Sequence, residues 1–186
     1  MVVNEKALMR CMKEAYRNQG YTVAVDEDDW MMINGGYWMV KIAEEETSNE
    51  LRSLITLHMR HLPRNGEAYK TVKTKNGPFV QKMLLEDAMS AEEKLKGKLM
   101  LGDASQNTMK RTELILRNCG VWQDTKDMRI MLVDPRYEQL IDRPIDVTRA
   151  GHGLYQSDDI SILWVLAVQD NEAQDKIEHL AEIHWV

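Results

Sequence analysis

The residue types with the most versatile chemistry in this chain are its five histidines, because imidazole can bind a metal ion or move a proton near neutral pH. His58 and His61 lie three positions apart, a spacing that presents two imidazoles on one side of a helix. No acidic residue lies within the same helix turn to complete a metal site. His179 and His184 are five positions apart and fall on different faces of a helix. We therefore expect His58 to be half-buried, His61 to be exposed near the C-terminus of its helix where its charge favours the helix dipole, and no metal site or cofactor.

A second candidate for chemistry is His152, which lies between Gly151 and Gly153 and is followed by Asp158 and Asp159. A histidine with a carboxylate partner can act as a general base, so these residues define a candidate hydrolase-like or metal-assisted site. A usable site also needs a nucleophile or a metal and an oxyanion donor. The sequence contains no phosphate-binding loop, nucleophile elbow, zinc-protease helix or paired zinc cysteines. The alternative interpretation is a glycine-flanked turn that leads into a strand.

The two cysteines offer little as nucleophiles. Cys11 falls on the apolar stripe of a predicted helix, and Cys119 precedes Gly120 in a predicted turn. Two cysteines are too few for a disulfide framework, so we expect reduced thiols, of which Cys119 is the accessible one. The chain is therefore predicted to be a non-enzymatic protein.

Charge is distributed unevenly along the chain. There are 24 basic and 30 acidic residues, a net charge of −6, which argues against non-specific binding to free DNA. The acidic residues form two short clusters, and a modest basic stretch follows them: Asp26, Glu27, Asp28 and Asp29; Glu44, Glu45 and Glu46; then Lys70, Lys73, Lys75 and Lys82. Such clusters are commonly solvated faces, but an acidic edge can also steer a basic partner into place.

Aromatic residues flank the first acidic cluster. Trp30, Tyr37 and Trp38 could form an aromatic anchor with a charged rim, which is the composition of an interface hot spot. Met31, Met32 and Met39 lie beside them in the sequence and are either core residues or part of an adaptable binding surface. The candidate partner-binding residues are Asp26, Glu27, Asp28, Asp29, Trp30, Tyr37, Trp38, Glu44, Glu45, Glu46, Asp158 and Asp159.

The elements that position these residues can be predicted from periodicity. Asn4 is a good N-cap for an amphipathic helix that ends at Gly20. Alternating apolar residues over 21–25 and apolar runs over 30–33 and 37–42, with Asn34-Gly35-Gly36 between the last two, predict a three-stranded meander with a type I′ turn.

The central part of the chain predicts a pair of helices. A capping box from Thr47 to Glu50 begins the first, which ends at Pro63. After a short strand over 68–72, Pro78 is expected at the first position of the second helix. The segment of about 90–110 has no clear period, and we expect a helix that frays into a mobile loop there.

Strands over 112–117 and 128–133 predict a second sheet or an extension of the first. Strands over 154–157 and 160–169 predict a hairpin, and the nearly continuous apolar run of the second indicates a central strand. A last helix is expected from Asn171. Residues 1–186 are thus predicted to form one α+β domain with a mainly antiparallel sheet and helices on one face. No membrane span or leader segment is found, which predicts a cytoplasmic location.

Three stretches carry a resemblance to known proteins: GYTVAVDEDDWMMINGGYWMVKI within the opening block, RAGHGLYQSDDISILWVLA, and the closing IEHLAEIHWV. They resemble small accessory proteins from phages and mobile elements of gut Firmicutes, most of all the type II anti-CRISPR proteins. The resemblance implies a protein that binds and blocks the Cas9–guide RNA effector inside the bacterial host cell. It transfers no individual functional residue. The remaining alternative is a structural or regulatory protein of a mobile element that forms a homodimer through a sheet edge.

Overall fold

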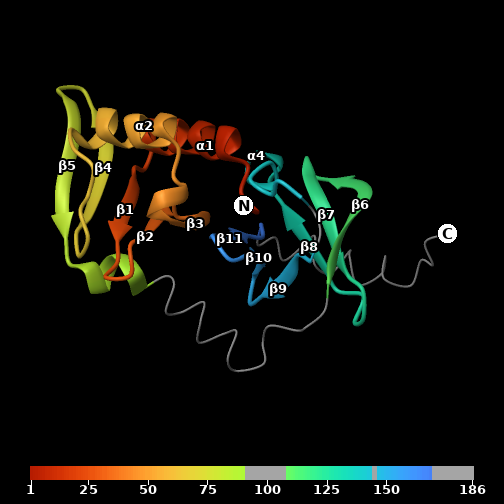
Figure 1. Ribbon diagram of the computed structural model, residues 1–186. Helices are drawn as coiled ribbons and strands as arrows, with labels where there is room; N and C mark the ends of the chain where they lie inside the picture. The colour runs from red at the N-terminus through yellow and green to blue at the C-terminus, as the bar shows by residue number, and fades with distance from the viewer. Residues whose placement is uncertain (91–107, 144–145, 169–186) are drawn as a thin grey trace.

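The computed structural model describes residues 1–90, 108–143 and 146–168, and these form two antiparallel sheets with helices (Figure 1). The larger sheet has eight strands in the order β5-β4-β1-β2-β3-β11-β10-β9, and the smaller has the order β6-β7-β8. The α+β class predicted from the sequence is confirmed. The strands of the larger sheet are β1 Tyr21–Val25, β2 Trp30–Asn34, β3 Trp38–Ala43, β4 Ala68–Thr74, β5 Gly77–Met83, β9 Thr148–Ala150, β10 Gly153–Ser157 and β11 Ser161–Leu166.

The first helix is α1, Glu5–Arg17, and it begins as predicted. Asn4 accepts a hydrogen bond from the backbone N–H of Ala7 at 3.1 Å, which satisfies one of the free donors of the first turn. The chain leaves the helix through Gly20, whose φ of +82° favours glycine. The buried stripe of α1 packs on the sheet.

The predicted meander β1–β2–β3 is confirmed, but its second turn differs from the expected type. Only Gly36 has a positive φ, and the N–H of Gly35 donates to the carbonyl of Trp38 at 3.0 Å. The turn is therefore centred on Gly36 and Tyr37. A type I′ turn needs positive φ at both central residues, so the single positive φ at Gly36 excludes that type.

The two faces of the larger sheet bury different residues because side chains alternate along each strand. Helices α1 and α2 (Asn49–Met59) cover one face, where Trp38, Val40 and Ile42 of β3 are buried. Met32 and Met39 are buried on the other face with Ala88, which belongs to a helical segment that starts at residue 85. The interpretation of the methionines as core residues is confirmed.

Helix α2 differs from its prediction at both ends. Its N-cap is Ser48, whose Oγ accepts from the N–H of Leu51 at 3.1 Å, and not Thr47, whose hydroxyl donates to Ala43. The helix ends at Met59 because Arg60 adopts a left-handed conformation with φ +68°. Pro63 therefore plays no part in ending it.

The helix expected to start at Pro78 is instead strand β5. Thr74 pairs with Gly77 and Lys73 pairs with Pro78, so β4 and β5 form a hairpin. Proline lacks a backbone N–H but is tolerated in a strand at the edge of a sheet, and β5 is an edge strand.

The smaller sheet consists of β6 (Met109–Leu116), β7 (Cys119–Asp124) and β8 (Ile130–Val133). The sequence predicted β6 and β8, but took the middle strand β7 for a short connecting run. A short helix, α4, covers Pro135–Glu138, where an irregular segment was expected. Hydrogen bonds from Met109 to Val147 and from Val168 to Leu132 join the two sheets.

The hairpin of β10 and β11 is confirmed, and β11 lies inside the sheet between β3 and β10. Its two faces are not equally buried, since Ser161, Leu163 and Val165 are buried while their neighbours are half-buried. The expected C-terminal helix and most of the segment of about 90–110 lie outside the described residues. Within the described residues, no helix is both long and apolar enough to cross a membrane.

Candidate partner-binding site

Strand pairing brings three acidic turns to one end of the larger sheet. The turn between β1 and β2 meets the 3₁₀ turn η1, Glu44–Glu46, where the N–H of Glu44 donates to the carbonyl of Asp29 at 2.8 Å. The N–H of Ala43 donates to the carbonyl of Ile160 at 3.0 Å, which adds the turn between β10 and β11. We call this end of the sheet the acidic rim: Asp26, Glu27, Asp28, Asp29, Glu44, Glu45, Glu46, Asp158 and Asp159.

Three carboxylates of the acidic rim are neutralised by cations. Lys41 lies 2.8 Å from Asp26, and Arg52 lies 3.2 Å from Glu44. The terminal ammonium of Met1 lies 2.9 Å from Asp158. These carboxylates hold the turns in place rather than presenting free charge.

Hydrogen bonds fix the backbone of the rim as well. Asp26 accepts from the N–H groups of Asp28 and Trp30 at 3.0 and 2.9 Å. Burial alone would raise the pKa of Asp26, but the hydrogen bonds from Lys41 and from these N–H groups outweigh it and lower the pKa. Asp158 accepts from the Ser161 hydroxyl at 2.7 Å. Its pKa is also lowered, since the bonds from the terminal ammonium, Ser161 and the N–H of Ile160 outweigh partial burial.

The other carboxylates of the rim remain available. Glu27, Asp28, Glu45, Glu46 and Asp159 are exposed, and none of them forms an ion pair in the part of the chain that the structure describes. Asp29 accepts only a neutral hydrogen bond, from Asn65 at 2.8 Å. The rim therefore combines a rigid base with six negative charges that form no ion pair among the described residues, including that of Asp29.

Of the three predicted anchor residues, only Trp30 lies at the acidic rim. It is half-buried, and Lys41 lies 5.6 Å from its ring centroid. Trp38 is 1% exposed, and the close approach of its ring to the backbone at Gly35 leaves no room for a side chain there. Tyr37 and Trp38 lie at the opposite end of β2 and β3, so the three residues do not form one surface.

Tyr37 instead belongs to a patch that the sequence analysis missed. Its side chain is 58% exposed and stacks on Tyr137 of α4, with ring centroids 6.1 Å apart. Arg136 lies over the Tyr137 ring at 5.4 Å and pairs with Asp134 and Glu14. The sequence did contain a signal for α4, which carries Tyr137: Asp134-Pro135 is an N-cap followed by proline at the first helical position.

The candidate catalytic residues His152, Asp158 and Asp159 are separated by the whole length of β10. His152 lies in the turn before this strand, and the two aspartates lie in the turn after it. Five residues of strand span about 16 Å, which is too far for proton transfer between these groups. The arrangement corrects the hydrolase-like hypothesis, because the histidine has no carboxylate partner from that pair.

The other reactive side chains are held in structural contacts. His58 Nδ1 lies 2.9 Å from the Tyr21 hydroxyl, and His61 packs edge-on against Tyr69 at 4.4 Å. Among the described residues, no group of three histidine, cysteine or acidic side chains is placed to bind a metal ion. Burial raises the pKa of Cys11 to about 11 and also raises the pKa of Cys119, so neither thiol is activated.

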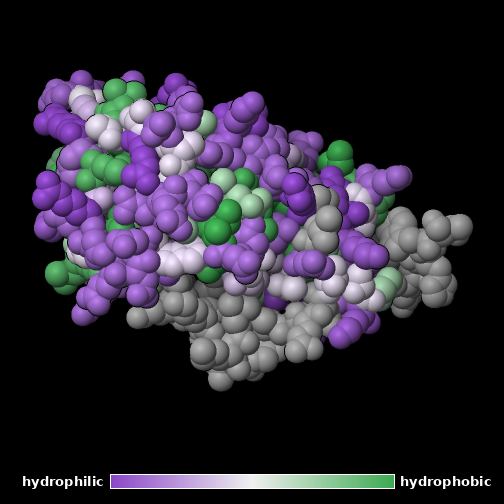
Figure 2. All heavy atoms as spheres, in the orientation of Figure 1, coloured by the Kyte–Doolittle hydropathy of each residue, from purple (hydrophilic) through white to green (hydrophobic). Residues whose placement is uncertain are grey.

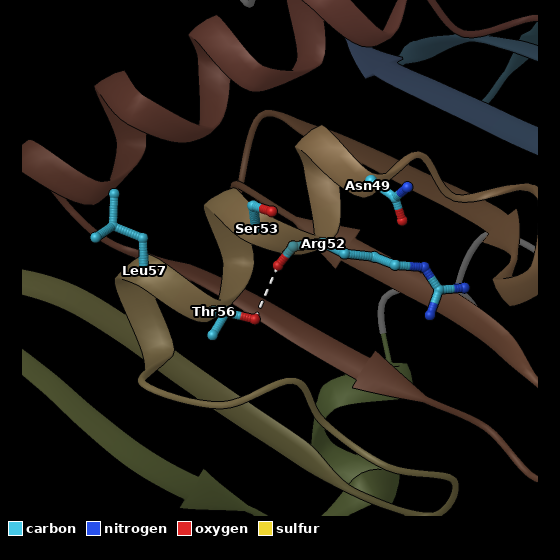
Figure 3. Close-up of a pocket in the computed structure, with 5 residues that line it drawn as sticks. All are labelled: Asn49, Arg52, Ser53, Thr56 and Leu57. Carbon is cyan, nitrogen blue, oxygen red and sulfur yellow. Dashed lines mark hydrogen bonds between the residues drawn. The ribbon is translucent and has the colours of Figure 1, made fainter.

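A shallow hollow of about 540 Å³ lies along the outer side of α2 (Figure 3). Its lining residues are Asn49, Arg52, Ser53, Thr56 and Leu57. The Thr56 hydroxyl donates to the backbone carbonyl of Arg52 at 2.9 Å, and the Arg52 guanidinium reaches towards Glu44. The lining contains no carboxylate, histidine or thiol, so the hollow lacks the groups of an acid–base site.

Polar side chains cover most of the face shown in Figure 2, and apolar residues appear there only in small separate patches. A binding mode on this face would depend on charge and a few anchors more than on a broad apolar surface. Comparison of the chain with protein-family models, curated proteins and solved structures finds no match.

Proposed function

We propose that this protein is a non-catalytic binding protein of a phage or mobile element that inhibits the Cas9–guide RNA effector in the cytoplasm of the bacterial host. The observation that carries the proposal is the acidic rim, with six carboxylates that form no ion pair among the described residues, on turns that three strand pairs hold together. The resemblance of the sequence to type II anti-CRISPR proteins supports the choice of partner.

The chemistry of the rim suits a basic protein that normally holds nucleic acid. Such proteins line their channels with lysine and arginine, and carboxylates can occupy positions where phosphates would otherwise lie. The rim turns are fixed by Asp26 and Asp158, so little ordering is needed on binding. The half-buried ring of Trp30 adds an aromatic contact beside the charge.

The geometry disfavours the enzymatic alternative. His152 and Asp158 are at opposite ends of β10, and burial raises the pKa values of both thiols. A binding function needs none of these groups to be activated.

The test is inhibition of DNA cleavage by purified Cas9 and guide RNA, with two matched variants. The rim variant carries Glu27→Gln, Asp28→Asn, Glu45→Gln and Glu46→Gln. The control carries Glu86→Gln, Asp87→Asn, Glu113→Gln and Asp146→Asn, which are exposed residues outside the rim. Both variants lose four negative charges, so the net charge is the same.

We expect the rim variant to need at least about tenfold more protein for half-maximal inhibition, while the control resembles the native protein. A pull-down of the Cas9–guide RNA complex should weaken with rising salt in the native protein. Normal cleavage at a large molar excess of native protein would refute the choice of partner. Equal losses in the two variants would refute the role of the rim.

A further inference from the structure

The hairpin of β4 and β5 has a charge opposite to that of the acidic rim. Residues 68–83 contain four lysines and no aspartate or glutamate, in a chain whose net charge is −6. The hairpin forms one lateral edge of the larger sheet, with β5 outermost (Figure 1). The negative net charge of the chain therefore conceals a separate basic surface.

Three of these lysines are free to meet a ligand. Lys70, Lys73 and Lys75 are exposed, and none of them forms an ion pair with any residue that the structure describes. Lys82 differs, because its ammonium lies 3.4 Å from Glu67 and 5.8 Å from the ring centroid of Tyr69. The free charge is thus concentrated on β4 and on the turn that follows it.

An exposed aromatic ring shares one face of the hairpin with Lys70, whereas Lys73, which pairs with Pro78, lies on the opposite face and Lys75 lies in the turn between the strands. Phe79 is 53% exposed and pairs with Val72, while Lys70 pairs with Gln81. Phe79 and Lys70 are therefore diagonal neighbours on one face of the hairpin, within reach of one another's side chains. A ring beside cationic groups can stack on an unpaired base while the lysines contact its phosphates.

Protection of a sheet edge explains only part of this pattern. A lysine on an edge strand, here Lys82 of β5, discourages pairing with another chain, and the lysines together would oppose a second copy of this hairpin. An exposed phenylalanine on the same strand has the opposite effect, because it favours association. Phe79 therefore needs another explanation, and charge complementarity points to an anionic ligand with flat rings.

We propose that the β4–β5 hairpin binds single-stranded RNA. The inference extends the proposed function, on which its biological context rests: the acidic rim would meet the protein part of a ribonucleoprotein and the hairpin its RNA. Single strands fit better than duplexes, because the bases of a duplex are already stacked and cannot reach Phe79.

The experiment measures RNA binding by the isolated full-length protein, without Cas9. The probe is a fluorescein-labelled single-stranded RNA of about 20 nucleotides, longer than the ~4–16-nucleotide sites of typical single-strand-binding domains. Fluorescence anisotropy is recorded over a series of salt concentrations. Duplex DNA of the same length serves as the second probe.

Two lysine variants are compared. One carries Lys70→Gln, Lys73→Gln and Lys75→Gln, and the control carries Lys6→Gln, Lys110→Gln and Lys126→Gln, which are exposed lysines outside the hairpin. The hairpin variant should bind RNA more weakly, and its slope of log affinity against log salt should be shallower by about 2. The control should keep the native slope. Far-UV circular dichroism checks that both variants are folded.

The aromatic contact is tested by Phe79→Val and Phe79→Trp. Valine keeps the strand preference but cannot stack, so we expect affinity to fall about tenfold, while tryptophan should retain it. No RNA binding by the native protein at the lowest salt, equal losses in both lysine variants, or duplex DNA bound as well as RNA would each overturn the proposal. Because Cas9 is absent, none of these outcomes bears on the inhibition test of the acidic rim.

Discussion

The Nδ1 atom of His58 lies 2.9 Å from the Tyr21 hydroxyl oxygen, which ties the last turn of α2 to the first residue of β1. The imidazole also stacks on Tyr16 of α1, with ring centroids 3.8 Å apart and an interplanar angle of 7°. Burial raises the pKa of Tyr21, so this phenol keeps its proton and can donate it to an unprotonated Nδ1. A neutral His58 can therefore accept this hydrogen bond at Nδ1 while its ring joins α1, α2 and the sheet.

The stability of the fold should decrease between pH 7 and pH 5 because of His58. Burial, and then the charges of Lys13 and Arg17, lower its pKa in the folded state. The unfolded chain has the ordinary histidine pKa of about 6.5, so below that pH it binds a proton that the folded chain does not. The loss begins near pH 6.5 and levels off once the pH is below the folded pKa.

Urea unfolding at pH 7, 6 and 5 measures this effect. His58→Phe keeps a ring against Tyr16 but cannot titrate, so we expect lower stability at pH 7 and a flatter dependence on pH. His61→Gln leaves His58 in place and is the control. An unchanged pH dependence in His58→Phe would show that other groups cause it.

The N-cap of α2 gives a second prediction. Ser48→Ala removes the acceptor of the Leu51 N–H and a hydrogen bond that the Ser48 hydroxyl donates to Glu5 of α1. We expect the free energy of unfolding to fall by about 1 kcal/mol. Thr47→Val is the matched comparison, because Thr47 only donates a long bond of 3.4 Å to Ala43. A larger loss in Thr47→Val than in Ser48→Ala, by thermal or urea unfolding, would contradict the assignment of the cap.

Local sequence patterns predicted the elements that depend on local interactions. The cap at Asn4, the turn before Trp38 and the hairpin of β10 and β11 were all visible in short windows of sequence. The strand β5 was missed because apolar residues over 78–88 also fit a helix. Its pairing with β4 outweighs that spacing, and the edge position accommodates Pro78.

Each acidic cluster could be predicted from the sequence, but not that the clusters lie together at one end of the sheet. That depends on the pairing of β3 with β11, which joins Ile42 to Ser161 across more than 100 residues of sequence. The placement of Trp38 was open to prediction, since Trp38, Val40 and Ile42 alternate along one strand and must share a face. The separation of His152 from Asp158 followed equally from the five-residue strand between them.

Two glycines with similar backbone conformations should respond differently to alanine. Gly20 and Gly36 have φ values of +82° and +89°. A Cβ at Gly36 would meet nothing within 4 Å, so Gly36→Ala should cost only the backbone strain, about 1–2 kcal/mol. A Cβ at Gly20 would collide with the backbone carbonyl of Thr71, which strand pairing holds in place. Gly20→Ala should therefore destabilise by about 1–3 kcal/mol more, measured by urea unfolding. Equal losses would mean that β4 moves to accommodate the methyl group.

The two thiols should differ in reactivity in a way that reports on local opening. Cys11 is 5% exposed, its Sγ donates to the carbonyl of Arg136 at 3.4 Å, and burial raises its pKa to about 11. Cys119 is half-buried on β7, and partial burial with the nearby charge of Asp134 raises its pKa as well.

The thiolate is the reactive form, so both cysteines should react with a disulfide reagent at pH 8 more slowly than a free thiol. Cys119 should react first, and Cys11 only as fast as α1 detaches from the sheet. In Cys119→Ser, the reaction rate of Cys11 should rise with urea concentration in the same way as the fraction of unfolded protein. Rapid labelling of Cys11 in native buffer would show that α1 opens separately from the rest of the fold.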